Sequence, residues 1–503
     1  MSPIAPNQKV SHVFVLMLEN HSFDNIFAFS GIPGLKIPKP GAKNTYNSVD
    51  YPVQNNAPIS MATDPGHEFL DVLAQLAGVG AIYPSGGPYP AIDGSGFAAS
   101  YATSLTEQTG LPQPSQIGDI MKCFDTPNQL PVLYQLATEF AVCDQWFSSL
   151  PGPTWPNRFF VHGASSAGLD HSPSSSDIFE WESDPLGGFE YPNGSIYDAL
   201  TKAGLKWRLY IDRSGPVAGS FAQVQSIKGI HYSTIRSFTN FATDLQGSYP
   251  YQYTFIEPNF GNLVNDTYQH GSSQHPMDGM SSGEWLIKAV YEAIRSSPLW
   301  SSSLLIVTYD EHGGFYDSCA PGPATPPADG SSGDLNQYGF AFDQYGVRVP
   351  AVVVSPYVPK GSVDHTLYDH SSVSATLENI FGFPPLTQRD AQANNVLGVL
   401  SLASPRLDCP MTLDPPAPAV VIERMATVEE KAVVAPQPLP SAGNLQGLLG
   451  VALKTEIELS NGSAAEKVAI MAKFKAIQTR GQAQAYIEDV MTRMRAAQAT
   501  QGN

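Results

Sequence analysis

A short apolar run that ends in two polar residues decides the fold: Val13-Phe14-Val15-Leu16-Met17-Leu18-Glu19-Asn20. Six consecutive apolar residues are typical of a strand buried on both faces, as in a parallel sheet. Comparable runs lie at 207–211, 253–256, 304–307 and 349–354, and a helical pattern occupies 284–295. This alternation predicts an α/β fold built on a doubly wound, mostly parallel sheet.

The composition limits what the protein binds. The chain has 503 residues and a net charge of −19, which argues against a nucleic-acid partner, because such a partner needs a basic face. No apolar run reaches the roughly 18 residues of a membrane span, so we expect no transmembrane segment. No signal peptide is visible, and the localisation stays open. Four scattered cysteines (Cys123, Cys143, Cys319 and Cys409) do not form a disulfide framework pattern, and their redox state is open.

The chain divides into three expected parts. Residues 1–409 are expected to form a catalytic domain, in which 30–120, rich in Gly, Pro, Ser and Asn, make a long excursion that caps the site. The proline-rich residues 410–440 are expected to be a linker. In the tail, 441–503, one helix is expected to begin after Ser463 and to end at Gly481, and a second to follow. This tail either packs on the body or docks a partner, a membrane or a second copy of the chain.

Polar side chains follow two of the expected strands directly. Glu19 and Asn20 leave the first strand, and Asp310 and Glu311 leave the run at 304–307. Ligand sites of such sheets lie beyond the carboxyl ends of the strands, and buried carboxylates there need compensation by a cation. Oxygen ligands favour one divalent cation, Ca²⁺, Mg²⁺ or Mn²⁺, over zinc. The alternative interpretation of either pair is a helix cap or a surface turn.

Thr154 is the candidate nucleophile. It lies just before Pro156, a residue that suits the first turn of a helix. Backbone N–H groups and the positive end of the helix dipole can bind a phosphate at that place, and a metal can activate a hydroxyl there. The alternative is that Thr154 only caps the helix.

Four histidines stand in loops rich in Gly and Pro: His67, His275, His312 and His370. A lone histidine is usually structural, but loops carry binding and catalytic groups more often than cores do. The chain contains no P-loop, no H-E-x-x-H zinc motif and no G-x-S-x-G nucleophile elbow.

Taken in order, these segments resemble the phospholipase C and acid phosphatase family of the alkaline-phosphatase-like superfamily. The similar stretches are Glu19-Asn20-His21-Ser22-Phe23-Asp24, Asp64-Pro65-Gly66-His67, Thr154-Trp155-Pro156-Asn157-Arg158, His275-Pro276-Met277-Asp278, Tyr309-Asp310-Glu311-His312-Gly313-Gly314 and Tyr368-Asp369-His370-Ser371-Ser372. Two positions depart from the family pattern. His21 stands where the family usually has Arg, and Thr154 replaces the Ser of the acid phosphatase.

The resemblance implies a role for each candidate residue. The metal would be held by Glu19, Asn20, Thr154, Asp310 and Glu311. His275 would protonate the leaving alcohol with support from Asp278, and His67 would bind a phosphoryl oxygen. His312 and His370 would support these groups from behind.

The expected activity is hydrolysis of a phosphoric ester. The first hypothesis is a phospholipase C, which releases diacylglycerol and a phosphorylated head group through a phosphothreonine intermediate. An acid phosphatase that cleaves small phosphomonoesters is the second. The third hypothesis is a non-catalytic protein that uses the same fold to bind a metal or a partner. Its partner could be a second copy of the chain, bound through 441–503.

Overall fold

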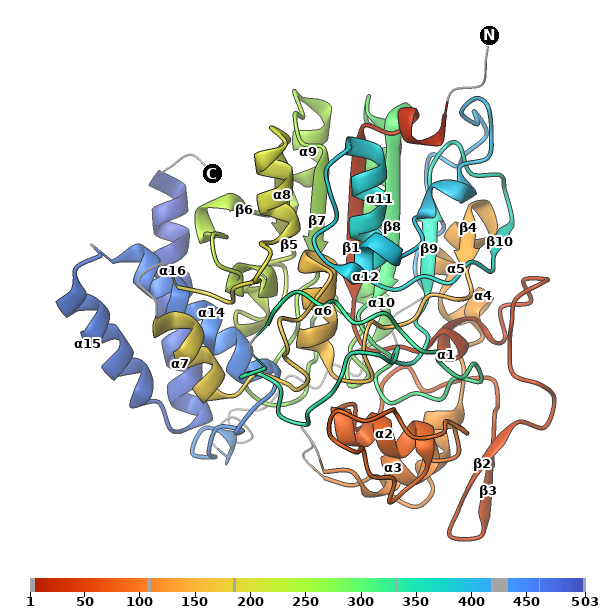
Figure 1. Ribbon diagram of the computed structural model, residues 1–503, viewed down its shortest axis with the longest axis horizontal. Coiled ribbons are helices and arrows are strands. Elements are labelled where there is room, and N and C mark those ends of the chain that lie inside the picture. The colour runs from red at the N-terminus through yellow and green to blue at the C-terminus, as the bar shows by residue number, and fades with distance from the viewer. Residues whose placement is uncertain are drawn as a thin grey trace.

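A computed structural model describes residues 5–105, 110–183, 187–331, 333–417, 433–460 and 462–500 (Figure 1). Its centre is an eight-stranded sheet with the strand order β10-β4-β9-β8-β1-β7-β5-β6. The strands are β1 (His12–Leu18), β4 (Ala141–Cys143), β5 (Trp207–Ile211), β6 (Ile235–Ser237), β7 (Tyr253–Glu257), β8 (Ser303–Tyr309), β9 (Ala351–Val354) and β10 (Ser362–Asp364). β9 is antiparallel to β8 and β4, whereas the other neighbours are parallel. The predicted α/β class with a mostly parallel sheet is confirmed.

Helices cover both faces of this sheet. Phe14 of β1 packs on Phe241 of α9 (Phe241–Gln246), and Phe255 of β7 packs on His162 of α6 (Thr154–Gly163). Phe14 lies beside Thr254, and successive strand residues face opposite sides, so α9 and α6 lie on opposite faces. The other helices of the body are α1 (Phe23–Phe27), α4 (Thr126–Gln129), α5 (Pro131–Glu139), α7 (Ser175–Ser183), α8 (Ile196–Lys202), α10 (Met280–Arg295), α11 (Ser371–Phe381) and α12 (Gln388–Gln392).

In the described residues of the expected excursion, 30–105 and 110–120, the chain forms regular elements. The excursion contains a hairpin of β2 (Lys43–Tyr46) and β3 (Val49–Pro52) and the helices α2 (Phe69–Ala77) and α3 (Phe97–Thr103). These helices lie at the end of the body towards which β1 points (Figure 1). They share a small apolar core of their own, to which Phe315 contributes from the segment after β8. The excursion therefore covers the carboxyl ends of the central strands.

Residues 433–500, called the C-terminal extension below, contain α14 (Asn444–Leu459), α15 (Ala464–Lys475) and α16 (Arg480–Thr500). The helix after Ser463 was expected, but the stop at Gly481 is wrong, because Gly481 is the second residue of α16. A Cβ there would lie 2.9 Å from that of Ala435, so the glycine serves a close approach. Residues 418–432 of the expected linker lie outside the described residues. No helix in the described part of the chain has the length and hydrophobicity to cross a bilayer.

Candidate active site

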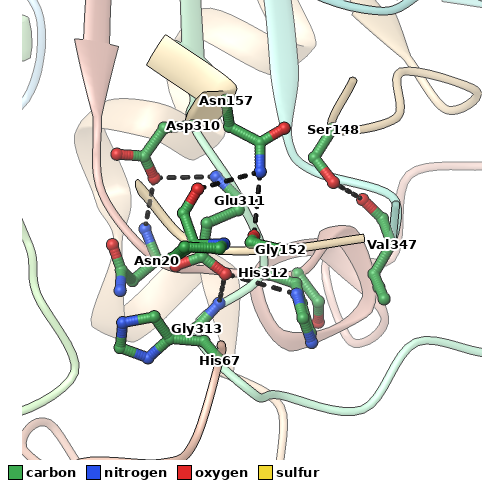
Figure 2. Close-up of polar contacts among 12 residues, drawn as sticks. Asn20, His67, Ser148, Gly152, Asn157, Asp310, Glu311, His312, Gly313 and Val347 are labelled. Carbon is green, nitrogen blue, oxygen red and sulfur yellow. Dashed lines mark hydrogen bonds and ion pairs between the residues drawn. The ribbon is translucent and has the colours of Figure 1, made fainter. Parts of the chain in front are cut away.

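The ends of two neighbouring strands and the start of one helix bring the candidate residues together. Asn20 follows β1, Asp310 follows β8, and the first residue of α6 is Thr154. The Thr154 hydroxyl donates to Asn20 Oδ1 at 3.3 Å. Asp310 Oδ1 accepts the backbone N–H of Asn20 at 3.1 Å and that of Glu311 at 2.7 Å (Figure 2). Segments that are far apart in the sequence thus meet at one place, as the strand-end pattern predicts.

Arg158 lies at the centre of this meeting point. Its Nε donates to Asp310 Oδ2 at 2.8 Å, and its Nη1 lies 3.5 Å from Oε1 of Glu257, the last residue of β7. The guanidinium also donates to the carbonyls of Met17 and Leu18. Arg158 stands in one of the segments that resemble the family, but no role was predicted for it. Its position four residues after Thr154, on the same face of a helix, is the signal that could have found it.

The carboxylates at this site outnumber the cationic groups. Glu19, Glu257, Asp310 and Glu311 are fully buried around the single guanidinium of Arg158. Among the described residues, neither oxygen of Glu19 has a hydrogen-bond partner within 3.5 Å, and neither does Oε1 of Glu311. The charge of Arg158 and the Ser273 side chain only partly offset the burial of Glu19. Burial, and then the charge of Asp310, raise the pKa of Glu19 to about 8. Unsatisfied oxygens at this depth are costly unless a ligand or a cation meets them.

The start of α6 is shaped so that the Thr154 hydroxyl faces Asn20. The residue before it, Pro153, is the N-cap and makes no side-chain capping bond. The side chain of Asn157 bonds instead to the backbone of the preceding turn, at Leu150, Gly152 and Pro153 (Figure 2). Thr154 is therefore not the capping residue, and its hydroxyl is directed at the strand ends.

Two glycines let the turns of the site fit together. Gly313 has φ of 61°, and a Cβ there would lie 2.1 Å from the carbonyl oxygen of Asn20. Gly314 has φ of 74°, and a Cβ there would lie 2.7 Å from that of Pro65. Only glycine accepts both the left-handed backbone and this closeness. The turn after β8 thereby lies between the β1 turn and the segment that carries His67.

His275 is buried and held by stacking. Its ring lies parallel to that of Tyr268, with centroids 3.5 Å apart. Nδ1 accepts the Met277 N–H at 3.4 Å, so in the neutral ring the hydrogen is on Nε2, which lies 3.7 Å from Asp64 Oδ2. Burial lowers the pKa of His275 well below its ordinary value. The free site therefore keeps this ring neutral at neutral pH.

His67 faces His275, with ring centroids 6.4 Å apart. Its Nδ1 donates to the Pro65 carbonyl at 2.8 Å. Asp278, expected to support His275, uses its carboxylate differently: it accepts the backbone N–H groups of His270, Gly271 and Gly279. The carboxylate beside the His275 ring is that of Asp64.

His312 lies beside the Glu311 carboxylate, and His370 contacts the backbone carbonyl of Asp310. His312 Nδ1 lies 3.3 Å from Glu311 Oε2, and its Nε2 is 2.7 Å from Oε1 of Gln75 in α2. His370 Nε2 donates to the Asp310 carbonyl at 2.6 Å, and its Nδ1 accepts the Trp146 N–H. Through these contacts, His312 connects the site to α2 of the excursion, and His370 connects the residue after β8 to Trp146.

The family of the chain is known from its sequence. Residues 10–384 match the family described as "Phosphoesterase family". This match spans all of the segments described above, and the chain belongs to that family.

Similar proteins of known sequence are phospholipases C. "Non-specific phospholipase C6" of Arabidopsis thaliana is 35% identical over 81% of this chain and 76% of its own length. "Phospholipase C B" of Mycobacterium tuberculosis is 26% identical over 81% of this chain and 80% of its length. Among solved structures, an alkaline phosphatase superfamily protein of Vibrio parahaemolyticus covers 53% of this chain and 64% of its own, at 13% identity and a TM-score of 0.30. That likeness is too distant to carry a functional argument.

Proposed function

We propose that the chain is a phospholipase C, which cleaves the bond between phosphorus and the glycerol oxygen of a phospholipid. One observation carries the proposal. The Thr154 hydroxyl, at the start of a helix, is bonded to Asn20 beside the unpartnered carboxylate oxygens of Glu19 and Glu311. The activity printed in the names of the relatives supports the same reaction.

In the proposed reaction, the Thr154 hydroxyl gives its proton to solvent and Oγ attacks phosphorus in line with the glycerol oxygen; Oγ takes a proton back from solvent when the phosphorylated head group is released in the second step. The bond from phosphorus to that oxygen breaks, and the oxygen takes up a proton, which completes diacylglycerol. The phosphorylated head group remains on Thr154 as an ester. Water then attacks phosphorus, releases the phosphorylated head group and returns the hydroxyl of Thr154. Backbone N–H groups of the first turn of α6 stabilise charge on the phosphoryl oxygens.

The proposal of a divalent cation is supported by the donors at the strand ends, which are oxygen atoms. The buried, unpartnered oxygens of Glu19 and Glu311 and the amide oxygen of Asn20 are suitable ligands. Among the described residues, no three His, Cys, Asp or Glu side chains are placed so that they could hold a metal ion together. Asp310 Oδ2, an oxygen of one expected ligand, is bonded to Arg158. We propose that Glu19, Asn20, Thr154, Asp310 and Glu311 hold the cation, which when bound neutralises surplus charge and lowers the pKa of the nucleophile hydroxyl.

The two histidines serve the proton transfers. His275 presents Nε2–H, and the negative charge of the substrate together with Asp64 favours its protonated form. It gives a proton to the glycerol oxygen and takes one from water in the second step. His67 binds a phosphoryl oxygen in its protonated form, in which Nε2–H donates to that oxygen while Nδ1–H donates to the Pro65 carbonyl.

The loop before His275 lines a cavity whose walls are mostly polar but include two exposed leucines. The cavity has a volume of about 850 Å³ and reaches Tyr268, which stacks on His275. Leu70 and Leu105, which are 53% and 66% exposed, line its rim. Apolar rim residues can meet acyl chains, whereas a small phosphomonoester does not need them.

The test compares two substrates. Purified protein with Ca²⁺, Mg²⁺ or Mn²⁺ is given phosphatidylcholine vesicles or p-nitrophenyl phosphate. We expect diacylglycerol and phosphocholine from the vesicles, and a phosphorylated Thr154 peptide when the reaction is quenched. Cleavage of the monoester alone would identify a phosphatase. A folded, cation-loaded protein that cleaves neither would be a binding protein.

A further inference from the structure

The C-terminal extension reaches the active site through one buried ion pair. Arg480, the first residue of α16, donates from Nη1 to the Val264 carbonyl and to Asp266 Oδ1, both at 2.8 Å. Its Nη2 donates to Asp266 Oδ2. Arg480 is buried. A bidentate guanidinium–carboxylate pair of this kind fixes both position and orientation.

Asp266 lies in the loop that leads to His275. Four residues of this loop other than glycine, Asp266, Tyr268, His270 and Gln274, have φ between 51° and 67°. Such residues avoid the left-handed region, and a backbone with several of them persists only when its surroundings impose it. Arg480 holds one of these residues directly.

The same loop places the ring that stacks on His275. Tyr268 is two residues after Asp266, is buried, and lies within 4° of parallel to the His275 ring. Asp266, Tyr268 and Arg480 all line the cavity of about 850 Å³ beside the site. The contact made by the extension is therefore adjacent to the histidine that the reaction needs.

A second contact supports the nucleophile in the same way. Trp155, next to Thr154, donates its indole N–H to Asn444 Oδ1 of α14 at 2.9 Å. A Cβ at Gly447 would lie 2.0 Å from the Trp155 ring, so α14 packs directly against the indole. The extension thus contacts the immediate neighbours of both Thr154 and His275.

We propose that the C-terminal extension supports catalysis by positioning active-site residues. In this proposal, Arg480 is a positioning residue that holds the Tyr268 ring against the ring of His275. The inference rests on the proposed function for its kinetic consequence. The claim that Arg480 positions the Tyr268 ring on His275 does not depend on which substrate the protein cleaves. Arg480 acts through Asp266 and the loop backbone, without touching the reacting atoms.

The experiment combines kinetics with NMR on the full chain. Arg480→Ala is expected to lower kcat on phosphatidylcholine about tenfold or more, because a small displacement of a catalytic group is enough for such a loss, with KM nearly unchanged. Asp266→Ala should have the same effect, and the double variant should lose no more than either single one. Arg480→Lys, which keeps the charge, should recover part of kcat. Arg493→Ala, which breaks a pair with Glu456 inside the extension, is the control and should keep wild-type kcat.

In protein labelled at histidine, the His275 ring protons should resonate upfield through the Tyr268 ring current, an assignment made with His275→Gln. Arg480→Ala should remove that upfield shift, and Arg493→Ala should keep it. A folded Arg480→Ala protein with wild-type kcat and an intact upfield shift would overturn the inference. If the wild type cleaves no phosphoester, the proposed function fails, and the NMR comparison still decides whether Arg480 sets the stack.

Discussion

Arg158 and Arg348 are both fully buried and both bonded to two carboxylates, yet their surroundings differ. Arg348 Nη2 donates to Asp24 at 2.8 Å and Nε to Asp317 at 3.1 Å. Asp24 also accepts a backbone N–H from Ser318, and Asp317 accepts two more. Every carboxylate oxygen around Arg348 thus has a partner.

Around Arg158, some carboxylate oxygens have no hydrogen-bond donor among the described residues. Asp310 and Glu257 contact the guanidinium, and Glu19 and Glu311 add two further carboxylates whose oxygens are in part without hydrogen bonds among the described residues. A buried charge that is fully partnered marks a structural cluster, whereas surplus oxygen atoms mark a place where something binds. The comparison predicts stability effects at Arg348 and activity effects at Arg158.

The largest effect is expected from Thr154→Ala, which removes the proposed nucleophile on the Arg158 side. The turnover number should fall roughly 10³-fold or more with an unchanged melting temperature. Thr126→Ala is the matched control, because that buried hydroxyl donates to the Ile26 carbonyl and should affect stability alone. A loss of less than tenfold in Thr154→Ala would remove this residue from the mechanism.

Arg348→Met tests the structural cluster. It leaves Asp24 and Asp317 buried without their cation, so the free energy of unfolding should fall by about 3–5 kcal/mol, measured by urea denaturation. Activity per folded molecule should stay at the wild-type level. A folded variant with full stability would show that the cluster contributes little.

Two amide substitutions sharpen the contrast. Glu19→Gln replaces an acid whose charged form is disfavoured by burial and by Asp310 more than it is favoured by Arg158. The variant should therefore leave the metal-free protein as stable or more so, while kcat falls about 10²-fold. Asp24→Asn weakens its bond to Arg348 and should cost about 1–3 kcal/mol of stability with little change in kcat. A loss of stability in Glu19→Gln together with a loss of kcat in Asp24→Asn would contradict this prediction.

Removal of the cation should affect the Arg158 side alone. A chelator should abolish activity, and Ca²⁺, Mg²⁺ or Mn²⁺ should restore it. A bound cation at 100 times its dissociation constant should add about 2.7 kcal/mol to stability, seen as a higher melting temperature. Asp24→Asn should keep this increase and Glu19→Gln should lose most of it. Full activity in protein shown to be metal-free would contradict the cation role.

The smallest effect is a pH dependence of stability in chelator-treated protein. The pKa of Glu19 is raised from 4.5 to about 8 in the folded chain, so the native state binds more protons than the unfolded state between these values. The contribution of Glu19 to the free energy of unfolding should therefore fall as the pH rises from about 4.5 to about 8. Subtracting the Glu19→Gln curve from the wild-type curve measures it, and a flat difference would argue against the raised pKa.

Much of the sheet could be predicted because its strands are local apolar runs. The run at 207–211 coincides with β5, and the run at 13–18 lies within β1. The three-residue strands β4, β6 and β10 were missed because such short segments carry no periodicity. α14 was missed because most of its residues are buried, which removes the amphipathic pattern.

By itself, the sequence determined the α/β class, the polar residues at the ends of β1 and β8, and Thr154 at the start of a helix, because strand runs, turns and helix starts are local patterns. Only the tertiary structure decided that Arg158 neutralises Asp310, that Asp64 rather than Asp278 lies beside His275, and that Arg480 holds the loop of Tyr268. These pairs join residues 152, 211 and 214 positions apart. Such contacts depend on which segments pack together, and no local pattern encodes that choice.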